Sequence, residues 1–376
     1  MNDGVTGWGA YEEARTKAGD TSSIKREKMK APDVRHFDKR AVAFDGNWML
    51  WRNLSSLMVR ISTPSVAQNW QRYLVDMTVG QIARTANLLA ATELVVFFDG
   101  PHNFRYDVYP AYKASRRDKQ PRASADDVED DVEVIHPMQA FPLLSQVLIE
   151  RGYAYSVVER YEADDLMASY AKHFEMSRKG DVLYLMTRDK DILQSIAPNV
   201  IRYTPAVGKK SPETYVTADT MLTAAATELG KGLTPYQHLV YQVLAGDSGD
   251  DVPGILGPKS ALAVVRDPSF TTMSEWLKTP TGKVVATNHR AELNRNAQLV
   301  KLVSTLYLQD TKPHKMLNLP KANLTKTEVT NSSIPFSKST LAAIQALNTR
   351  LTYDKRGLFS GPARKTVNRA SLIKTE

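Results

Sequence analysis

The stretch Tyr161-Glu162-Ala163-Asp164-Asp165 places three carboxylates within four residues, directly after the strand-like segment 155–158. Apolar residues at helical spacing come next and predict a helix: Leu166, Met167, Tyr170, Ala171 and Phe174. One or two acids in a first helical turn are ordinary, because the helix dipole favours negative charge there. Three together repel one another, so we expect cations between them.

Acids also stand at the ends of other predicted strands. The strands and the acids after them are 41–44 before Asp45, 94–98 before Asp99, and 182–186 before Asp189 and Asp191. Ligands of open parallel sheets collect at the carboxyl ends of the strands. Asp189 and Asp191 are two residues apart, so in extended backbone their side chains face the same way. The sequence therefore predicts an acid-lined site at one edge of a sheet.

A further pair of acids lies in the loop Gly246–Gly254, which follows a predicted helix over 236–245. Asp247 and Asp250 are three residues apart in that loop. A glycine-bounded turn then opens a short helix that runs through Val265. Free N–H groups at such a helix start, with Lys259 beside them, suit a phosphate, although an ordinary helix-turn-helix connection explains the same residues equally well.

The chemistry of these acids points to hard cations. The candidate metal ligands are Asp45, Asp99, Glu162, Asp164, Asp165, Asp189, Asp191, Asp247 and Asp250. Oxygen-rich sites without His or Cys suit Mg²⁺ or Mn²⁺ rather than zinc. Two such ions about 4 Å apart could clamp the attacking water and the leaving oxygen of a phosphodiester. A glycosidase needs only two carboxylates, so that class of enzyme would leave most of these nine acids unexplained. The sequence lacks the Gly-x-x-x-x-Gly-Lys loop, which argues against a nucleotide-driven motor.

The insertion 101–135 divides into a basic, aromatic half and an acidic half. Its first half contains Arg105, Tyr106, Tyr109, Tyr112, Lys113, Arg116, Arg117, Lys119 and Arg122; its second contains Asp126, Asp127, Glu129, Asp130, Asp131 and Glu133. A solvated linker with opposed charge runs is one interpretation. The clustering of Tyr and Arg favours the other, a mobile element that contacts phosphates and bases.

Composition limits the class of protein. The chain has 376 residues, 42% of them hydrophobic, no cysteine and a formal charge of +8. Disulfides and Cys-based zinc sites are therefore excluded. The net positive charge is compatible with binding to a polyanion. The sequence has no apolar run of the roughly 18 residues a membrane span needs, and its first 20 residues do not resemble a signal peptide. We expect a soluble cytoplasmic protein, in the host cytoplasm if phage-encoded, with no membrane partner.

Taken together, these motifs resemble the 5′-nuclease superfamily, which includes flap endonucleases, the 5′→3′ exonuclease domain of DNA polymerase I and stand-alone phage exonucleases. The resemblance runs from about Ala41 to Leu306. It rests on Phe98-Asp99-Gly100-Pro101, Phe104-Arg105, Tyr112-Lys113-Ala114-Ser115-Arg116, Tyr161–Asp165, Thr187–Asp191 and Gly246–Gly254. Two departures are Arg188, where the family usually has glycine, and a turn after Gly254 that is about two residues short.

The resemblance implies an α/β fold: a PIN-like 5′-nuclease core with a mostly parallel central sheet, a helical arch and a helix–three-turn–helix DNA-binding module. The first metal, which would be the more tightly held, would be served by Asp45, Asp99, Glu162, Asp164 and Asp165. The second would be served by Asp189, Asp191, Asp247 and Asp250. Lys113 and Arg116 would contact the scissile phosphate as catalytic residues. The implied DNA-binding residues are Arg105, Tyr112, Lys113, Arg116, Arg117, Gly254, Gly257 and Lys259. The implied cofactors are two divalent ions, Mg²⁺ or Mn²⁺, and a K⁺ ion at the helix–three-turn–helix module.

The expected domain organisation follows the same resemblance. It consists of a mobile leader (1–39), a nuclease core (40–205) with the arch at about 101–135, a helical duplex-binding region (206–330) with the module at about 235–266, and a C-terminal helix with a basic tail (331–376).

The function implied is a metal-dependent, structure-specific 5′-nuclease that acts as a monomer on branched, nicked or 5′-ended DNA or an RNA–DNA hybrid. It would remove RNA primers or flaps during replication. Two alternatives remain open at this point. One is a PIN-type ribonuclease, which would cut single-stranded RNA. The other is a non-catalytic structure-specific DNA-binding protein on the same fold.

Overall fold

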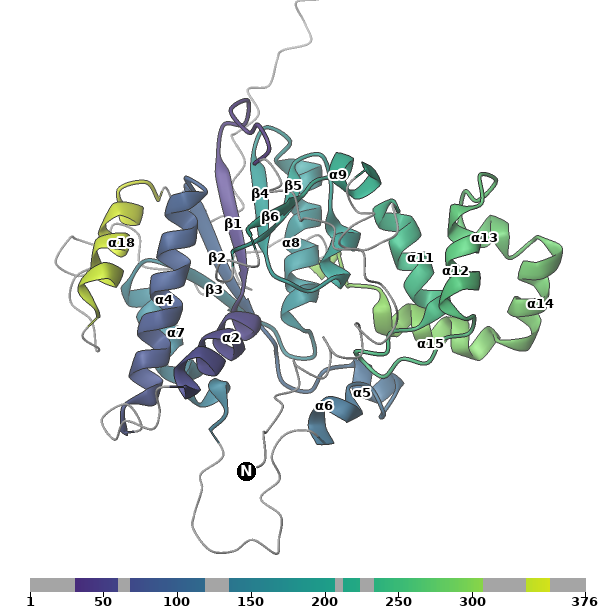
Figure 1. Ribbon diagram of the computed structural model, residues 1–376, viewed down its shortest axis with the longest axis horizontal. Helices are drawn as coiled ribbons and strands as arrows, with labels where there is room; N and C mark the ends of the chain where they lie inside the picture. Colours follow the sequence, from purple (N-terminus) through teal and green to yellow (C-terminus); the bar gives the residue numbers. More distant parts are fainter. Residues whose placement is uncertain are drawn as a thin grey trace, which may run out of the picture.

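The computed structural model describes residues 31–59, 68–118, 135–206, 212–223, 233–306 and 336–351. Its centre is a six-stranded sheet in the order β3-β2-β1-β4-β5-β6 (Figure 1). The strands are β1 Arg40–Asp45, β2 Glu93–Phe98, β3 Ala154–Val157, β4 Val182–Met186, β5 Val200–Thr204 and β6 Thr214–Val216. All neighbours pair in parallel except β5 and β6, which are antiparallel.

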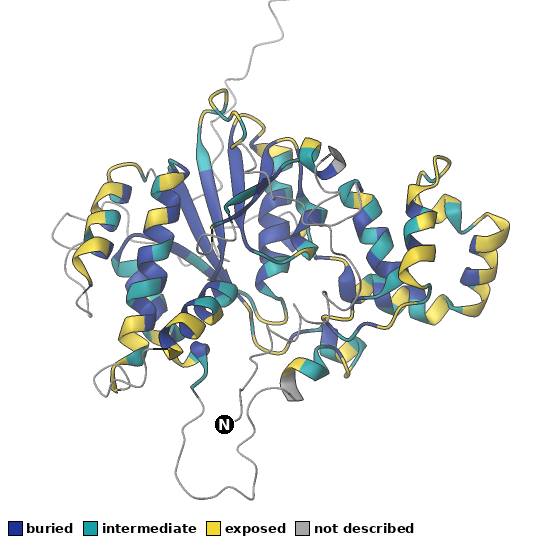
Figure 2. Ribbon diagram, in the orientation of Figure 1, coloured by how far each residue is buried: buried dark blue, intermediate teal, exposed yellow. Residues whose placement is uncertain are grey.

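The sheet is buried on both faces, which explains its almost continuously apolar strands. Alternate residues of β1 supply the two cores: Val42 and Phe44 belong to one apolar cluster, Ala41 and Ala43 to the other. Helices cover the first face: α2 Gly46–Met58, α4 Trp70–Leu88, α7 Phe141–Glu150 and α18 Lys338–Asn348. The helix α8, Ala163–Ser177, covers the second face. Figure 2 shows the strands as the dark, buried centre between these layers.

A helical region with its own apolar core extends from one side of the sheet (Figure 1). Its helices are α11 Pro235–Ala245, α12 Pro258–Arg266, α13 Met273–Trp276, α14 Pro280–Asn288 and α15 Arg290–Val300. The short elements α5 Arg105–Val108, α6 Ala114–Asp118, η1 Pro137–Ala140, η2 Asp191–Ser195 and α9 Ala218–Thr223 complete the described chain.

The predicted α/β class and mostly parallel sheet are confirmed. The region from residue 206, which was expected to be helical, also contains β6, and this strand extends the sheet to Val216. The sheet therefore crosses the expected domain boundary at residue 205. In addition, α18 packs on the core helix α4, where Gly80 leaves room for Thr340. The leader up to residue 30, arch residues 119–134 and the tail beyond residue 351 lie outside the described residues.

Candidate active site

The candidate site begins where β1 and β4 lie side by side at the centre of the sheet. From these two strands the chain continues toward opposite edges of the sheet, the arrangement that opens a ligand-binding crevice at the carboxyl ends. Asp45 is the last residue of β1. Its Oδ1 accepts the Trp48 N–H at 2.9 Å and so caps α2, while its Oδ2 accepts the Thr187 hydroxyl at 2.8 Å. One carboxylate thus joins the ends of both strands.

Asp99, directly after β2, is held beside Asp45 by an amide from α2. The Asn47 Nδ2 donates to Asp99 Oδ2 at 2.7 Å, and the Asp99 N–H donates to Asn47 Oδ1 at 3.1 Å. The other oxygen of Asp99 accepts the Ala163 N–H at the start of α8, at 2.8 Å. These contacts bring the ends of β2, α2 and α8 together.

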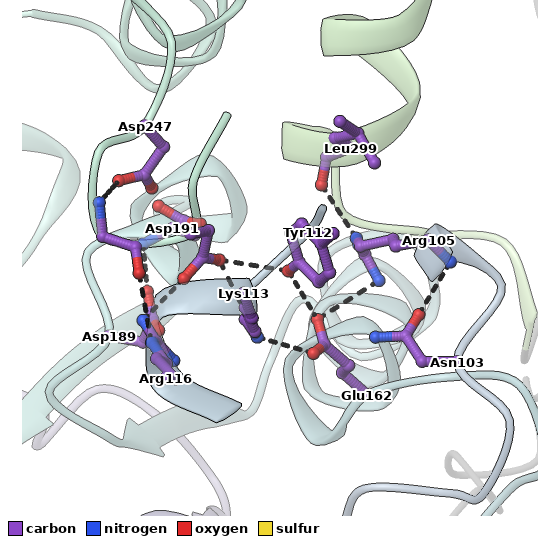
Figure 3. Close-up of polar contacts among 12 residues, drawn as sticks. Asn103, Arg105, Tyr112, Lys113, Arg116, Glu162, Asp189, Asp191, Asp247 and Leu299 are labelled. Atoms are coloured by element: carbon purple, nitrogen blue, oxygen red, sulfur yellow. Dashed lines mark hydrogen bonds and ion pairs between the residues drawn. The ribbon is translucent and has the colours of Figure 1, made fainter. Parts of the chain in front are cut away.

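Glu162, at the N-terminus of α8, receives three donors from the insertion (Figure 3). Lys113 Nζ lies 2.6 Å from Oε1, and the Tyr112 hydroxyl donates to Oε2 at 3.1 Å. Arg105 Nη1 lies 3.4 Å from Oε2. Although burial alone would raise it, Lys113 and Arg105 hold the pKa of Glu162 below its ordinary value. This acid is ionised and bound to the base of the insertion.

The remaining acids form a second group beside the first. Oxygens of Asp191, Asp247 and Asp250 all lie within 4.8 Å of one another. Lys190 Nζ lies 2.6 Å from Asp247 Oδ1, and Arg116 Nη2 lies 2.5 Å from Asp250 Oδ1. Asp250 Oδ2 also lies 3.0 Å from the Tyr112 hydroxyl oxygen and 3.7 Å from Lys113 Nζ. Lys113 and Tyr112 therefore bridge the two groups of acids.

The loop after α11 places Asp247 and Asp250 by tight backbone packing. Gly246 has φ +73°, and a Cβ there would lie 2.3 Å from the Val252 carbonyl oxygen. Asp247 and Val252 exchange backbone hydrogen bonds of 2.8 Å across the loop. The buried Asn296 of α15 holds it from below by donating to the Pro253 carbonyl at 2.8 Å. Only glycine fits this conformation at position 246.

Burial, and after it like charge, disfavours the ionised form of several acids in both groups. Burial and neighbouring carboxylates raise the pKa of Asp45 to about 7 and that of Asp99 to about 6. The same causes raise the pKa of Asp164 and that of Asp191 well above the ordinary value. Asp189 is a like-charge neighbour of Asp45, Asp164 and Asp191, so it lies between the groups.

These residues fit a divalent cation. Asp164 Oδ1 is buried and makes no hydrogen bond to any described residue, a costly arrangement for a carboxylate without a cation. The ligand atoms would all be carboxylate oxygens, whose negative charges repel one another. A bound hard cation would offset that repulsion. The site can therefore hold divalent ions at two adjoining groups of carboxylates.

Asp165 is a correction to the predicted metal ligands. Its two oxygens accept a bidentate pair of hydrogen bonds from Arg105, at 2.6 and 2.8 Å, and Oδ1 also accepts the Val303 N–H at 2.9 Å. Both side chains are buried, with Arg105 1% exposed. Arg105 also donates from Nε to the Leu299 carbonyl at 2.8 Å. This ion pair fastens the insertion and the segment after α15 to α8, so both oxygens of Asp165 already have protein partners and Arg105 does not face solvent.

Tyr112 is the second correction. The prediction assigned it to DNA, but it is 2% exposed and its hydroxyl serves Glu162 and Asp250. Of the other predicted contact residues, Arg116 is 56% exposed at its side chain, and Gly254, Gly257 and Lys259 are exposed. The Arg117 side chain lies outside the described part of the chain.

Sequence reasoning missed four residues whose side chains touch the acids: Asn47, Thr187, Lys190 and Gln242. Asn47, Thr187 and Lys190 had a usable signal, because each stands within two residues of a predicted ligand. Gln242 had none, since it lies inside an apolar helix and its contact comes only from folding.

Comparisons with known proteins find a family and relatives with similar sequences. A family model described as "5'-3' exonuclease, N-terminal resolvase-like domain" matches residues 40–225. A 5'-3' exonuclease of Aquifex aeolicus (strain VF5) is 30% identical over 176 residues, 46% of this chain and 52% of that protein. DNA polymerase I of Bacillus caldotenax is 28% identical over 234 residues, 61% of this chain and 23% of the polymerase. The chain thus spans about half or less of the length of these relatives.

Solved structures share the fold. The bacteriophage T5 D15 protein co-crystallised with metal ions superposes with a TM-score of 0.51 at 19% identity, over 71% of this chain and 91% of that one. The T5 D15 flap endonuclease in a pseudo-enzyme-product complex with DNA and metal ions gives 0.52 at 18% identity, over 82% and 100%. Among the described residues, no helix is both long and apolar enough to cross a bilayer.

Proposed function

Because the chain belongs to the 5′-nuclease superfamily, we propose that it is a metal-dependent, structure-specific 5′-nuclease. It would act as a 5′→3′ exonuclease and flap endonuclease on DNA with 5′ ends or flaps, and remove RNA primers or flaps during replication. The observation that carries this proposal is the convergence of carboxylates from β1, β2, α8, the end of β4 and the loop after α11.

Two divalent ions, Mg²⁺ or Mn²⁺, would be held by the two groups of acids, with Asp165 now left out. When bound, such ions lower the pKa of an attacking water and neutralise charge on the leaving oxygen of a phosphodiester. In this proposal the acids act only as metal ligands. They hold position, and Asn47 and Thr187 fix the rotamers of Asp99 and Asp45.

Lys113 and Arg116 supply positive charge beside the acids. Burial would lower the pKa of Lys113, but Glu162 and the other acids around it raise that pKa well above the ordinary value. Lys113 therefore stays cationic at neutral pH and acts by attraction for a phosphate, not as a general base. Arg116 is partly exposed and forms a bridge from α6 to Asp250, so it can reach a strand that enters the site.

Duplex DNA would bind along the helical region. The connection from α11 to α12 presents the exposed Gly254, Gly257 and Lys259, and α12 begins at Pro258 with free backbone N–H groups. We assign the helix–three-turn–helix role, with K⁺ held by main-chain oxygens, to this connection. The protein would work as a cytoplasmic monomer on branched, nicked or 5′-ended DNA, and also on an RNA–DNA hybrid.

The test is digestion of end-labelled 5′-flap and nicked duplexes with Mg²⁺ or with EDTA, with product lengths resolved. We expect Mg²⁺-dependent cuts near the flap junction and none in EDTA. The double variant Asp189→Asn, Asp191→Asn should still bind the flap and cut it at least about 100-fold more slowly. Undiminished cleavage by this variant would reject the acid assignment. Preferential cleavage of single-stranded RNA would instead favour a PIN-type ribonuclease.

A further inference from the structure

Gln242 of α11 contacts the second group of acids from inside the protein. It is 2% exposed, and its Nε2 donates to Asp191 Oδ1. Asp191 is one of the three acids whose oxygens lie within 4.8 Å of one another. A neutral side-chain amide of the helical region thus donates to a candidate metal ligand.

The direction of the hydrogen bond between Gln242 and Asp191 follows from two backbone groups, one of which can only donate and the other only accept. The Leu302 N–H can only donate, and it lies 3.2 Å from Gln194 Oε1. The other end of the Gln194 amide is therefore its NH₂ group, which donates to the Val300 carbonyl at 2.8 Å and to Gln242 Oε1 at 3.3 Å. Gln242 must then present its own NH₂ group to Asp191.

Repulsion among the acids gives this contact its importance. Asp191 lies beside Asp247 and Asp250, and without an anchor like charges would turn these carboxylates apart. The backbone N–H of Asp191 is already committed to Asp189 Oδ1, at 2.7 Å, so it cannot hold its own side chain. The Gln242 amide is a donor that fixes the Asp191 carboxylate before any cation arrives.

We propose that Gln242 is a positioning residue that orients Asp191 for a divalent cation, with Gln194 fixing the orientation of the Gln242 amide. The inference rests on the proposed function, because it assumes that the acids bind metal. It extends that function by making cation affinity depend on how α11 and the segment after α15 pack against the core.

Calorimetric titration of the full chain with Mn²⁺, without DNA, tests the inference. Gln242→Met keeps the length of the side chain and removes the donor. We expect its affinity for the weaker of two Mn²⁺ ions to fall about 10- to 100-fold, as for other residues that orient metal ligands. Gln194→Met should lower the same affinity by a smaller factor. Gln298→Met, on the exposed side of α15, is the matched control and should bind Mn²⁺ like the wild type.

The outcomes separate the two proposals. A wild-type chain that binds no Mn²⁺ would reject the proposed function itself. If the wild type binds Mn²⁺ but no more tightly than Gln242→Met does, only the positioning role is rejected. A lower stability of Gln242→Met in EDTA would not change that conclusion. If Gln242→Met does not fold, Gln194→Met decides: unchanged affinity overturns the inference, and a weaker affinity supports it.

Discussion

Asp164 and Asp165 are neighbours in the chain with opposite surroundings. Asp165 faces Arg105, and backbone N–H groups satisfy its remaining hydrogen bonds. Asp164 has a buried oxygen without a hydrogen bond to a described residue, and burial and four nearby carboxylates raise its pKa. One residue stabilises the metal-free fold and the other strains it, although both are acids in the first turn of α8.

Opposite effects on stability should follow in EDTA. Asp165→Asn removes the charge of the bidentate partner of the buried Arg105 and should lower the free energy of unfolding by about 3–5 kcal/mol. Asp164→Asn removes a repelling charge and should raise the midpoint of denaturant unfolding. Urea titrations of both variants and the wild type measure this. A wild-type-like Asp165→Asn would contradict the ion pair.

Metal-free stability should also depend on pH. The pKa of Asp45 is raised to about 7 and that of Asp99 to about 6, against about 3.8 in an unfolded chain. Between these values the folded state binds more protons than the unfolded state, so stability falls as pH rises from about 4 to 7.

Magnesium should reverse this trend, because only deprotonated carboxylates bind it. The rise in melting temperature on adding saturating Mg²⁺ should therefore be larger at pH 8 than at pH 5. Thermal unfolding in Mg²⁺ and in EDTA at both pH values tests the expectation. An equal rise at both pH values would contradict it.

Among the elements of the site, the loop between α11 and α12 is tightly constrained at Gly246. Gly246→Ala would force a side chain into a left-handed conformation and against the Val252 carbonyl. We expect it to cost at least about 1–3 kcal/mol of stability and to lower flap cleavage more than flap binding. Gly180→Ala, in the turn before β4, is the matched control, since a Cβ at Gly180 comes near only the end of the Asp38 side chain, at 3.3 Å. Equal behaviour of the two variants would show that the loop does not position the acids.

The acids at strand ends could be predicted because strand, acid and helix are local patterns. Asp45, Asp99 and Asp189 needed only a short apolar run before them. Burial, in contrast, is set by packing between distant segments. Arg105 and Tyr112 have the composition of a DNA contact, yet their partners Asp165 and Glu162 lie far along the chain.

The edge strand β6 was missed for a related reason. It has only three residues, and it pairs antiparallel with β5 at the edge of an otherwise parallel sheet. Nothing in so short a run distinguishes an edge strand from the turns between helices, so the expected boundary of the core fell before β6.

At the scale of the whole molecule, charge is distributed unevenly. The tail 352–376 lies outside the described residues and contains Lys355, Arg356, Arg364, Lys365, Arg369 and Lys374. Removing it should leave cleavage at saturating flap unchanged and weaken binding at low salt. The slope of log affinity against log salt should become shallower by about 0.9 for each phosphate that the tail neutralises. An unchanged slope would show that the tail does not bind DNA.

The proposed nuclease activity requires that carboxylates from five segments hold divalent ions together. Anomalous diffraction from a crystal soaked in Mn²⁺ locates such ions. We expect two anomalous peaks about 4 Å apart, one of them bounded by Asp191, Asp247 and Asp250. Peaks elsewhere on the molecule, or none at these acids, would contradict it.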